Sequence, residues 1–344
     1  MEESASNRSP QIGRFAIYAW LDLVYNILVI LWGAVVRATG SGAGCGEHWP
    51  LCQGVVIPHA GKIATVIEFA HRSSSGIAVM LVVGLVLFAF RRFDKGHAAR
   101  RYAAAALFFT LTEGLIGAAL VLLGDVGDNA SMSRVLVLSL HLVNTFLLLA
   151  SLALTAKSAE GDRAARPFQA LDRKAMPPQA SGAGLYMAYG FGLAGTLAIA
   201  VTGAIAALSD TLFRATSLAQ GFQMDFSNAS NPILRLRIIH PAIAVIAGCF
   251  LMVLAAHTLI SPSSATAKHL ASYLLGLIIL QFSLGVLNVV LLAPLWMQVL
   301  HLLTADLVWV TLVLLSAEVL DSRRQARAGH LREAVHSYAR YMRT

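Results

Sequence analysis

The chain has 344 residues, of which 57% are hydrophobic and 13% are charged, and its mean hydropathy is +0.68. These values exclude an ordinary soluble domain and a disordered chain. The formal net charge of +8 does not indicate nucleic-acid binding, because its basic residues gather in alternate connections between apolar segments and in the C-terminal tail.

Eight apolar segments follow one another, each long enough to cross about 30 Å of hydrocarbon as a helix. In chain order, we expect helices at 15–36, 63–90, 103–123, 134–156, 185–208, 233–260, 270–292 and 295–318. The first segment is longer than the core of a signal peptide and has no clear cleavage site after it, so we expect it in the mature protein. The sequence therefore predicts an all-α polytopic membrane protein.

The distribution of Lys and Arg predicts the orientation of these helices. Basic residues fill the connections 91–101 and 157–174 and the tail 319–344, whereas few occur in the other connections. By the positive-inside rule, both termini are then cytoplasmic and the connection 37–62 faces outward.

The polar stretch 157–184 divides the apolar segments into an N-terminal half (1–156) and a C-terminal half (185–318), followed by the basic tail (319–344). The two halves resemble each other: VLSLHLVNTFLLLASL in the first half matches MQVLHLLTADLVWVTL in the second. The matched pairs are His71 with His240, His141 with His301 and, more loosely, Glu113 with Gln281. We therefore expect two pseudo-symmetric four-helix bundles related by an axis along the membrane normal.

Four histidines share one depth in this arrangement. Each lies in an even-numbered helix, 6–8 residues from its outer start, which is about 10 Å into the membrane. They are His71, His141, His240 and His301. Two imidazoles facing each other across a bundle suit the two axial positions of haem iron. The simpler interpretation, a histidine hydrogen-bonded between helices, explains one such residue better than four at matched depth.

Charged residues accompany the histidines of the first half. Glu68 precedes His71 by three residues and shares its helix face, so it is a candidate acid for chemistry there. Its alternative role is an ion pair with Arg72 or Arg37. Both arginines are candidates for binding haem propionates, and ordinary snorkelling to the interface is their alternative.

Two of the three cysteines, Cys45 and Cys52, lie close together in the Gly-rich outer stretch GSGAGCGEHWPLCQG. An oxidising outer compartment favours a disulfide between them. Such a bond would stabilise the fold by about 2–3 kcal/mol on the chain-entropy estimate. Thiol–disulfide exchange with a redox partner is the functional alternative.

Taken together, these motifs resemble the heme A synthase family. The resemblance extends from GAVVRATGSG (33–42) to HLLTADLVW (301–309) and includes the C-x6-C pair and the E-x-x-H-R motif. It implies an oxidoreductase acting on a CH or CH3 group, which converts haem O to haem A by oxidising the C8 methyl group to a formyl group for cytochrome oxidase.

The resemblance also implies roles for the site residues. His240 and His301 would ligate a haem b cofactor, His71 and His141 would surround the substrate haem O, and Glu68 would be the functional acid beside the substrate. The implied location is a bacterial plasma membrane. The implied partners are heme O synthase, cytochrome oxidase assembly factors and an unidentified electron donor or acceptor.

A different class of protein remains open at this point. Two bis-histidine haems in one bundle could form a b-type cytochrome that passes electrons from quinol. The shared depth of the four histidines disfavours that alternative, because a protein that transfers electrons across the membrane would hold its haems at two depths. A transporter would need a pair of helices broken at the bilayer midplane, and the sequence does not predict such a pair.

Overall fold

The computed structural model describes residues 13–59, 61–164, 183–227 and 230–341. Its described part is helical without a β-strand, apart from one isolated bridge between Cys52 and Val55. Eight of the helical spans are long and apolar enough to cross a membrane. The predicted all-α polytopic fold is confirmed.

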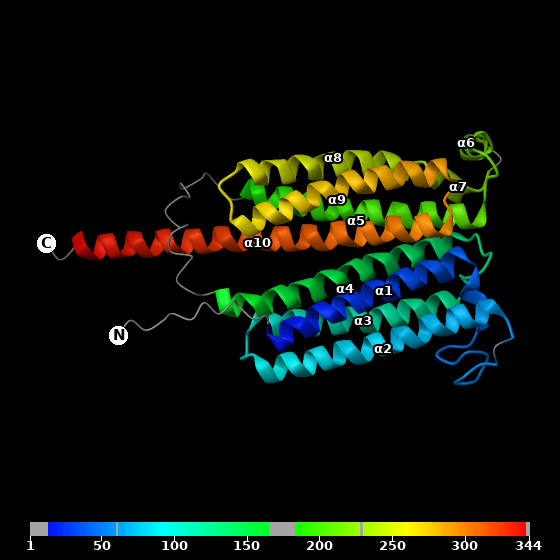
Figure 1. Ribbon diagram of the computed structural model, residues 1–344, viewed down its shortest axis with the longest axis horizontal. Helices are drawn as coiled ribbons and strands as arrows, with labels where there is room; N and C mark the ends of the chain where they lie inside the picture. Colours follow the sequence, from blue (N-terminus) through cyan, green and yellow to red (C-terminus); the bar gives the residue numbers. More distant parts are fainter. Residues whose placement is uncertain (1–12, 60, 165–182, 228–229, 342–344) are drawn as a thin grey trace, which may run out of the picture.

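The long helices run side by side, as Figure 1 shows. In chain order the elements are α1 (Arg14–Ala38), η1 (Ser41–Ala43), α2 (Ile63–Arg92), α3 (Ala98–Leu122), α4 (Met132–Ala164), α5 (Ala183–Leu212), α6 (Leu218–Phe226), α7 (Pro232–Arg237), α8 (Ile239–Ile260), α9 (Ala265–Val290) and α10 (Leu295–Tyr341). We call the end of the molecule that carries η1, α6 and α7 the disulfide end.

Helices α1 to α4 pack as a ring around one apolar core. Both α1 and α3 contact α2 and α4, so α2 and α4 occupy opposite corners. Ala19, Leu85, Ala103 and Leu149 supply fully buried side chains to this core, one from each helix. Small residues recur along it because alanine lets neighbouring helices approach closely in a membrane.

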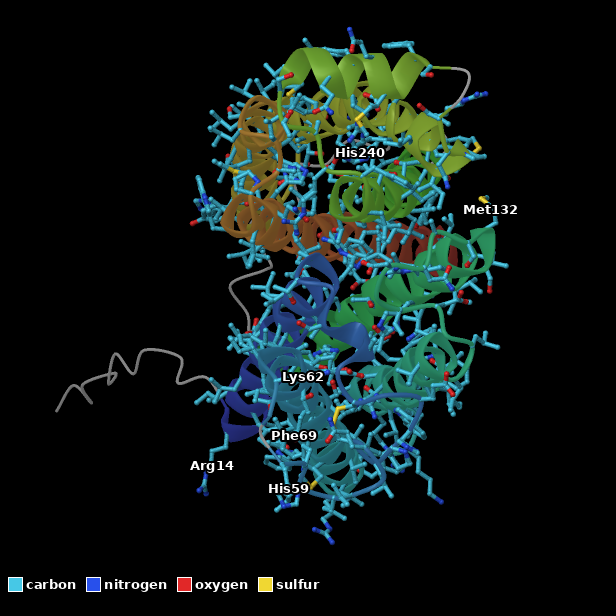
Figure 2. The ribbon with its side chains drawn as sticks, turned by 90° about the vertical axis from the view of Figure 1, so that its right-hand side faces the viewer. Arg14, His59, Lys62, Phe69, Met132 and His240 are labelled. Atoms are coloured by element: carbon cyan, nitrogen blue, oxygen red, sulfur yellow. A yellow bond between two sulfur atoms is a disulfide. The ribbon has the colours of Figure 1, made fainter. Side chains whose placement is uncertain are left out.

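Helices α5, α8, α9 and α10 form a second ring beside the first, visible in the end view of Figure 2. Helix α8 contacts α5 and α9, and α10 contacts the same two helices, which places α8 and α10 at opposite corners. Leu251, Leu274, Leu312 and Tyr189 are buried in its core.

The two rings are joined along α4 and α10. The indole N–H of Trp309 donates a hydrogen bond of 2.6 Å to the carbonyl of Phe146. The aromatic side chains of these two residues also pack edge to face. Farther from the disulfide end, Lys157 of α4 pairs with Glu318 of α10 at 2.5 Å. Contacts at two levels therefore hold the halves together.

One predicted span is interrupted. The segment 233–260 is formed by α7 and α8, which meet at Ile238. Pro241 explains the break, because it has no N–H to donate to the carbonyl of Arg237 and its ring crowds that carbonyl. Consequently His240 lies in the first turn of α8 rather than within a continuous helix.

Two further differences lie outside the membrane spans. Helix α6 was not expected from the sequence, and α10 continues through most of the basic tail to Tyr341. Of the polar stretch 157–184, the first residues extend α4 to Ala164, whereas 165–182 lie outside the described residues.

Candidate functional site

Each of the four predicted histidines packs against a glycine of the preceding long helix. A Cβ added to any of these glycines would contact the histidine ring, at distances from Cε1 that run from 3.0 to 3.9 Å. In order of increasing distance, the pairs are Gly203 with His240, Gly33 with His71, Gly285 with His301 and Gly117 with His141. The absence of a side chain gives each imidazole its space between helices, and the device recurs in both halves.

The two histidines of each half lie on helices at opposite corners of their ring. His71 lies on α2 and His141 on α4, which are opposite corners of the first ring. His240 and His301 hold the corresponding corners of the second ring. Two diagonal pairs thus lie near the disulfide end.

The polar surroundings of the two pairs differ. Beside His141, the carboxylate of Glu113 lies 3.4 Å from Nδ1. Beside His301, the side-chain nitrogen of Gln281 lies 3.2 Å from Nε2. His240 contacts the hydroxyl of Thr202 through Nδ1 at 3.2 Å. The first half therefore offers a carboxylate where the second offers an amide.

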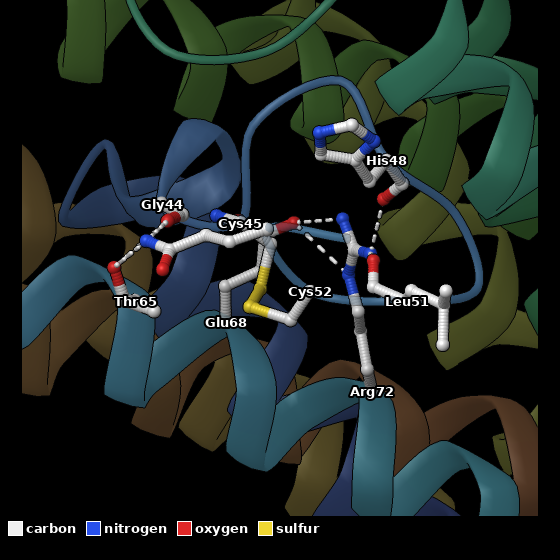
Figure 3. Close-up of a disulfide and its surroundings, with 9 residues drawn as sticks. Gly44, Cys45, His48, Leu51, Cys52, Thr65, Glu68 and Arg72 are labelled. Atoms are coloured by element: carbon white, nitrogen blue, oxygen red, sulfur yellow. Dashed lines mark hydrogen bonds and ion pairs between the residues drawn. A yellow bond between two sulfur atoms is a disulfide. The ribbon is translucent and has the colours of Figure 1, made fainter. Parts of the chain in front are cut away.

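Glu68 fastens the cysteine loop to α2, as the close-up in Figure 3 illustrates. Its side chain is buried, and Oε2 accepts a hydrogen bond of 2.7 Å from the backbone N–H of Cys45. Oε1 accepts hydrogen bonds from Arg72, the shorter being 2.6 Å. The ion pair with Arg72 that the sequence left as an alternative is thus present.

Arg72 continues this attachment into the loop. Its Nη1 donates to the carbonyls of His48 at 2.6 Å and Leu51 at 2.8 Å. Cys45 and Cys52 form the expected disulfide and are both buried. The disulfide and the Glu68–Arg72 pair therefore form one unit, one turn of α2 from His71.

Arg37 contacts the second half rather than the first. Its guanidinium donates to the carbonyl of Ala207 at 2.5 Å, to the hydroxyl of Thr211 at 2.8 Å and to Oε1 of Gln298 at 2.9 Å. Gln298 lies one turn before His301 on α10. The structure thus places Arg37 beside the His240–His301 pair, although it belongs to α1.

The residues present fit a bis-histidine haem in each half. Nδ1 of His71, His141 and His301 is buried without a hydrogen bond among the described residues, which is costly unless a water or another group pairs with it. The described residues contain no cluster of three or more His, Cys, Asp or Glu that could cage a metal ion. Paired imidazoles between apolar helices suit a metal that brings its own equatorial ligands.

Sequence reasoning singled out the four histidines but not the glycines beside them. A signal was available: Gly117 follows Glu113 by four residues, and Gly285 follows Gln281 by the same spacing. Because these segments matched only loosely, the shared glycine did not stand out from the many glycines of apolar helices.

Comparisons with known proteins agree with this arrangement. The profile of the COX15-CtaA family, described as cytochrome oxidase assembly protein, matches residues 16–313. A protein of Thermus thermophilus named protoheme IX farnesyltransferase is 43% identical over 333 residues, which cover 96% of this chain and 52% of that protein. The chain therefore spans about half the length of that relative.

Shorter matches carry a different name. A heme A synthase of Alkalihalophilus pseudofirmus is 38% identical over 112 residues, covering 33% of this chain and 38% of the relative. A heme A synthase of Shouchella clausii is 38% identical over 136 residues, covering 40% and 42%. Since the family profile covers most of the sequence, the chain belongs to the COX15-CtaA family of cytochrome oxidase assembly proteins.

Proposed function

We propose that this chain converts haem O to haem A by oxidising the C8 methyl group of the ring to a formyl group, for cytochrome oxidase biogenesis. The observation that carries the proposal is the pair of diagonal histidine couples, each seated on glycines. The family membership and the relatives named heme A synthase support the same activity.

The two halves would have different tasks. The N-terminal half (1–156) would hold the substrate haem O between His71 and His141. The C-terminal half (185–318) would hold a resident haem b between His240 and His301, a cofactor that supplies electron transfer when bound. The carboxylate beside His141 and the amide beside His301 support this division, because reactive and resident groups need different surroundings.

Glu68 and Arg72 would act at the outer edge of the substrate site. Their hydrogen bonds hold the disulfide loop against α2, one turn from His71. We propose that this loop covers the substrate half and excludes water, and that the Glu68 carboxylate supplies negative charge there. Arg37 and Arg72 would approach propionates, since guanidinium groups bind carboxylates strongly.

The setting follows from the charge pattern. We propose a multi-pass protein of a bacterial plasma membrane with both termini cytoplasmic and the disulfide end outward. A heme O synthase is the proposed partner that delivers the substrate. The Thermus thermophilus relative supports this partner, because it carries the name protoheme IX farnesyltransferase and is about twice as long as the matched region. An electron acceptor or donor and cytochrome oxidase assembly factors complete the proposed partners.

Haem analysis of the purified protein tests the proposal. The protein is produced in cells that make haem O, and its extracted haems are separated by chromatography. Haem b together with haem O or haem A is expected. Haem b alone at two equivalents per chain would instead indicate the alternative, a di-haem cytochrome.

A variant of Glu68 tests the assignment of the substrate half. We expect Glu68→Ala to retain haem b, because the His240–His301 pair lies in the other bundle, but to lose haem A formation. Haem A yield per mole of haem b is the measurement. An unchanged yield would contradict the proposed role of Glu68.

A further inference from the structure

Glu113 is held in place by a network that serves its carboxylate. Nδ2 of Asn144 donates to Oε2 at 2.6 Å, and the hydroxyl of Thr145 donates to Oε1. Asn144 is itself oriented by the hydroxyl of Thr112 at 2.6 Å and by the carbonyl of Phe109 at 2.8 Å. With its oxygens fixed in this way, Glu113 directs Oε1 to within 3.4 Å of Nδ1 of His141.

The second half has lost this network position by position. Gln281 stands at the place of Glu113, Leu280 at that of Thr112, and Ala305 at that of Thr145. Thr304 replaces Asn144, and its hydroxyl turns back to the carbonyl of Leu300 at 3.0 Å. The donors that fix a carboxylate are therefore present in the first half and replaced in the second.

A carboxylate between membrane helices is costly, and such residues are found where their charge is used. Packing alone does not explain Glu113, since the second ring packs the same position with a neutral glutamine. A negative charge beside one nitrogen of a metal-bound imidazole orients the ring and makes the ligand more basic. A more basic ligand stabilises oxidised iron relative to reduced iron.

We propose that Glu113 is a positioning residue of the first-half site, which acts through His141 by placing negative charge beside its Nδ1. Iron held between His71 and His141 is then oxidised more readily than iron held between His240 and His301. This inference rests on the proposed function, because it requires haem in both halves. The two sites are otherwise repeated, and the inference attributes the difference in their reduction potentials to the presence of Glu113 in one half and Gln281 in the other.

Reciprocal variants test the inference through reduction potentials. The full-length protein is purified in detergent and loaded with haem b as the probe, and both haems are followed in a spectroscopic redox titration. The first-half signal is identified by its loss in His71→Ala. Glu113→Gln should shift the ratio of oxidised to reduced iron in that half about tenfold, equal to about 59 mV upward for a one-electron couple. Gln281→Glu, combined with Thr304→Asn and Ala305→Thr to supply the donors that hold Glu113 in the first half, should shift the second-half midpoint downward.

The outcomes separate this inference from the function on which it rests. Two haems whose midpoints are unchanged in Glu113→Gln would overturn the inference alone, and so would equal shifts in both halves. If Glu113→Gln does not fold, an unchanged second-half midpoint in the combined Gln281→Glu, Thr304→Asn and Ala305→Thr variant overturns it. A wild-type protein that binds no haem in the first half would overturn the proposed function and the inference together.

Discussion

Gly203→Ala should weaken haem binding in the second half. A Cβ at this position would lie 3.0 Å from Cε1 of His240 and 3.4 Å from its Nδ1. These distances are shorter than ordinary carbon contacts, so the imidazole or helix α5 must move by several tenths of an ångström.

The size of the effect follows from the cost of overpacking. Adding a methyl group to a well-packed interior costs about 1–3 kcal/mol, which corresponds to roughly a 5–150-fold loss of affinity. Alanine favours a helix over glycine by about 1 kcal/mol, so the helix itself is not weakened. This gain offsets part of any loss in folding, and the displacement that falls on the His240 ring should appear as weaker haem binding.

Haem titration of the purified variant, followed by absorbance, measures this loss. Gly276→Ala is the matched control, because this glycine of helix α9 has no atom within 4 Å of an added Cβ. Gly117→Ala, with 3.9 Å to His141, should have a smaller effect on its own half. Wild-type affinity in Gly203→Ala, or an equal loss in Gly276→Ala, would refute the reasoning.

Three other substitutions address the contacts around the site. Replacing Cys45 and Cys52 by serine should lower the free energy of unfolding by about 2–3 kcal/mol. If the disulfide is purely structural, turnover per folded molecule stays intact. Lost turnover in the folded variant would instead show a redox role. Arg72→Met should loosen the part of the loop whose carbonyls it binds, at His48 and Leu51, measured as faster hydrogen exchange of the loop amides, and unchanged exchange would contradict the attachment. Arg37→Met should lower the free energy of unfolding by about 1.5–3 kcal/mol, the contribution of a hydrogen bond to a charged group, and a melting temperature equal to that of wild type would contradict a stabilising role of the guanidinium.

Much of the architecture could be predicted because hydropathy and charge act over whole segments. All eight predicted spans correspond to helical spans of the structure, since unpaired backbone groups are not tolerated in hydrocarbon. The break at Ile238 was missed, although Pro241 was visible in the sequence. A single proline in a strongly apolar run does not reveal whether the helix bends, breaks or continues.

The site was less predictable than the fold. The spacing of Glu68 and Arg72 allowed an ion pair, but nothing local indicated that both side chains also bind the backbone of the cysteine loop. Arg37 was predicted from its place at the end of a helix, whereas its partners lie on two helices far along the chain. Such contacts depend on how the two rings dock, which no pattern within one segment encodes.

Helix α10 takes part in both cores at once. Leu312 and Leu315 are buried in the second ring, whereas Trp309 and Val313 are buried in the first. In genetic terms, a substitution along this stretch is felt by both halves, while one in α2 or α8 is confined to its own bundle. A screen for variants that destabilise both bundles in one step should therefore converge on this helix, and so should suppressors that restabilise both.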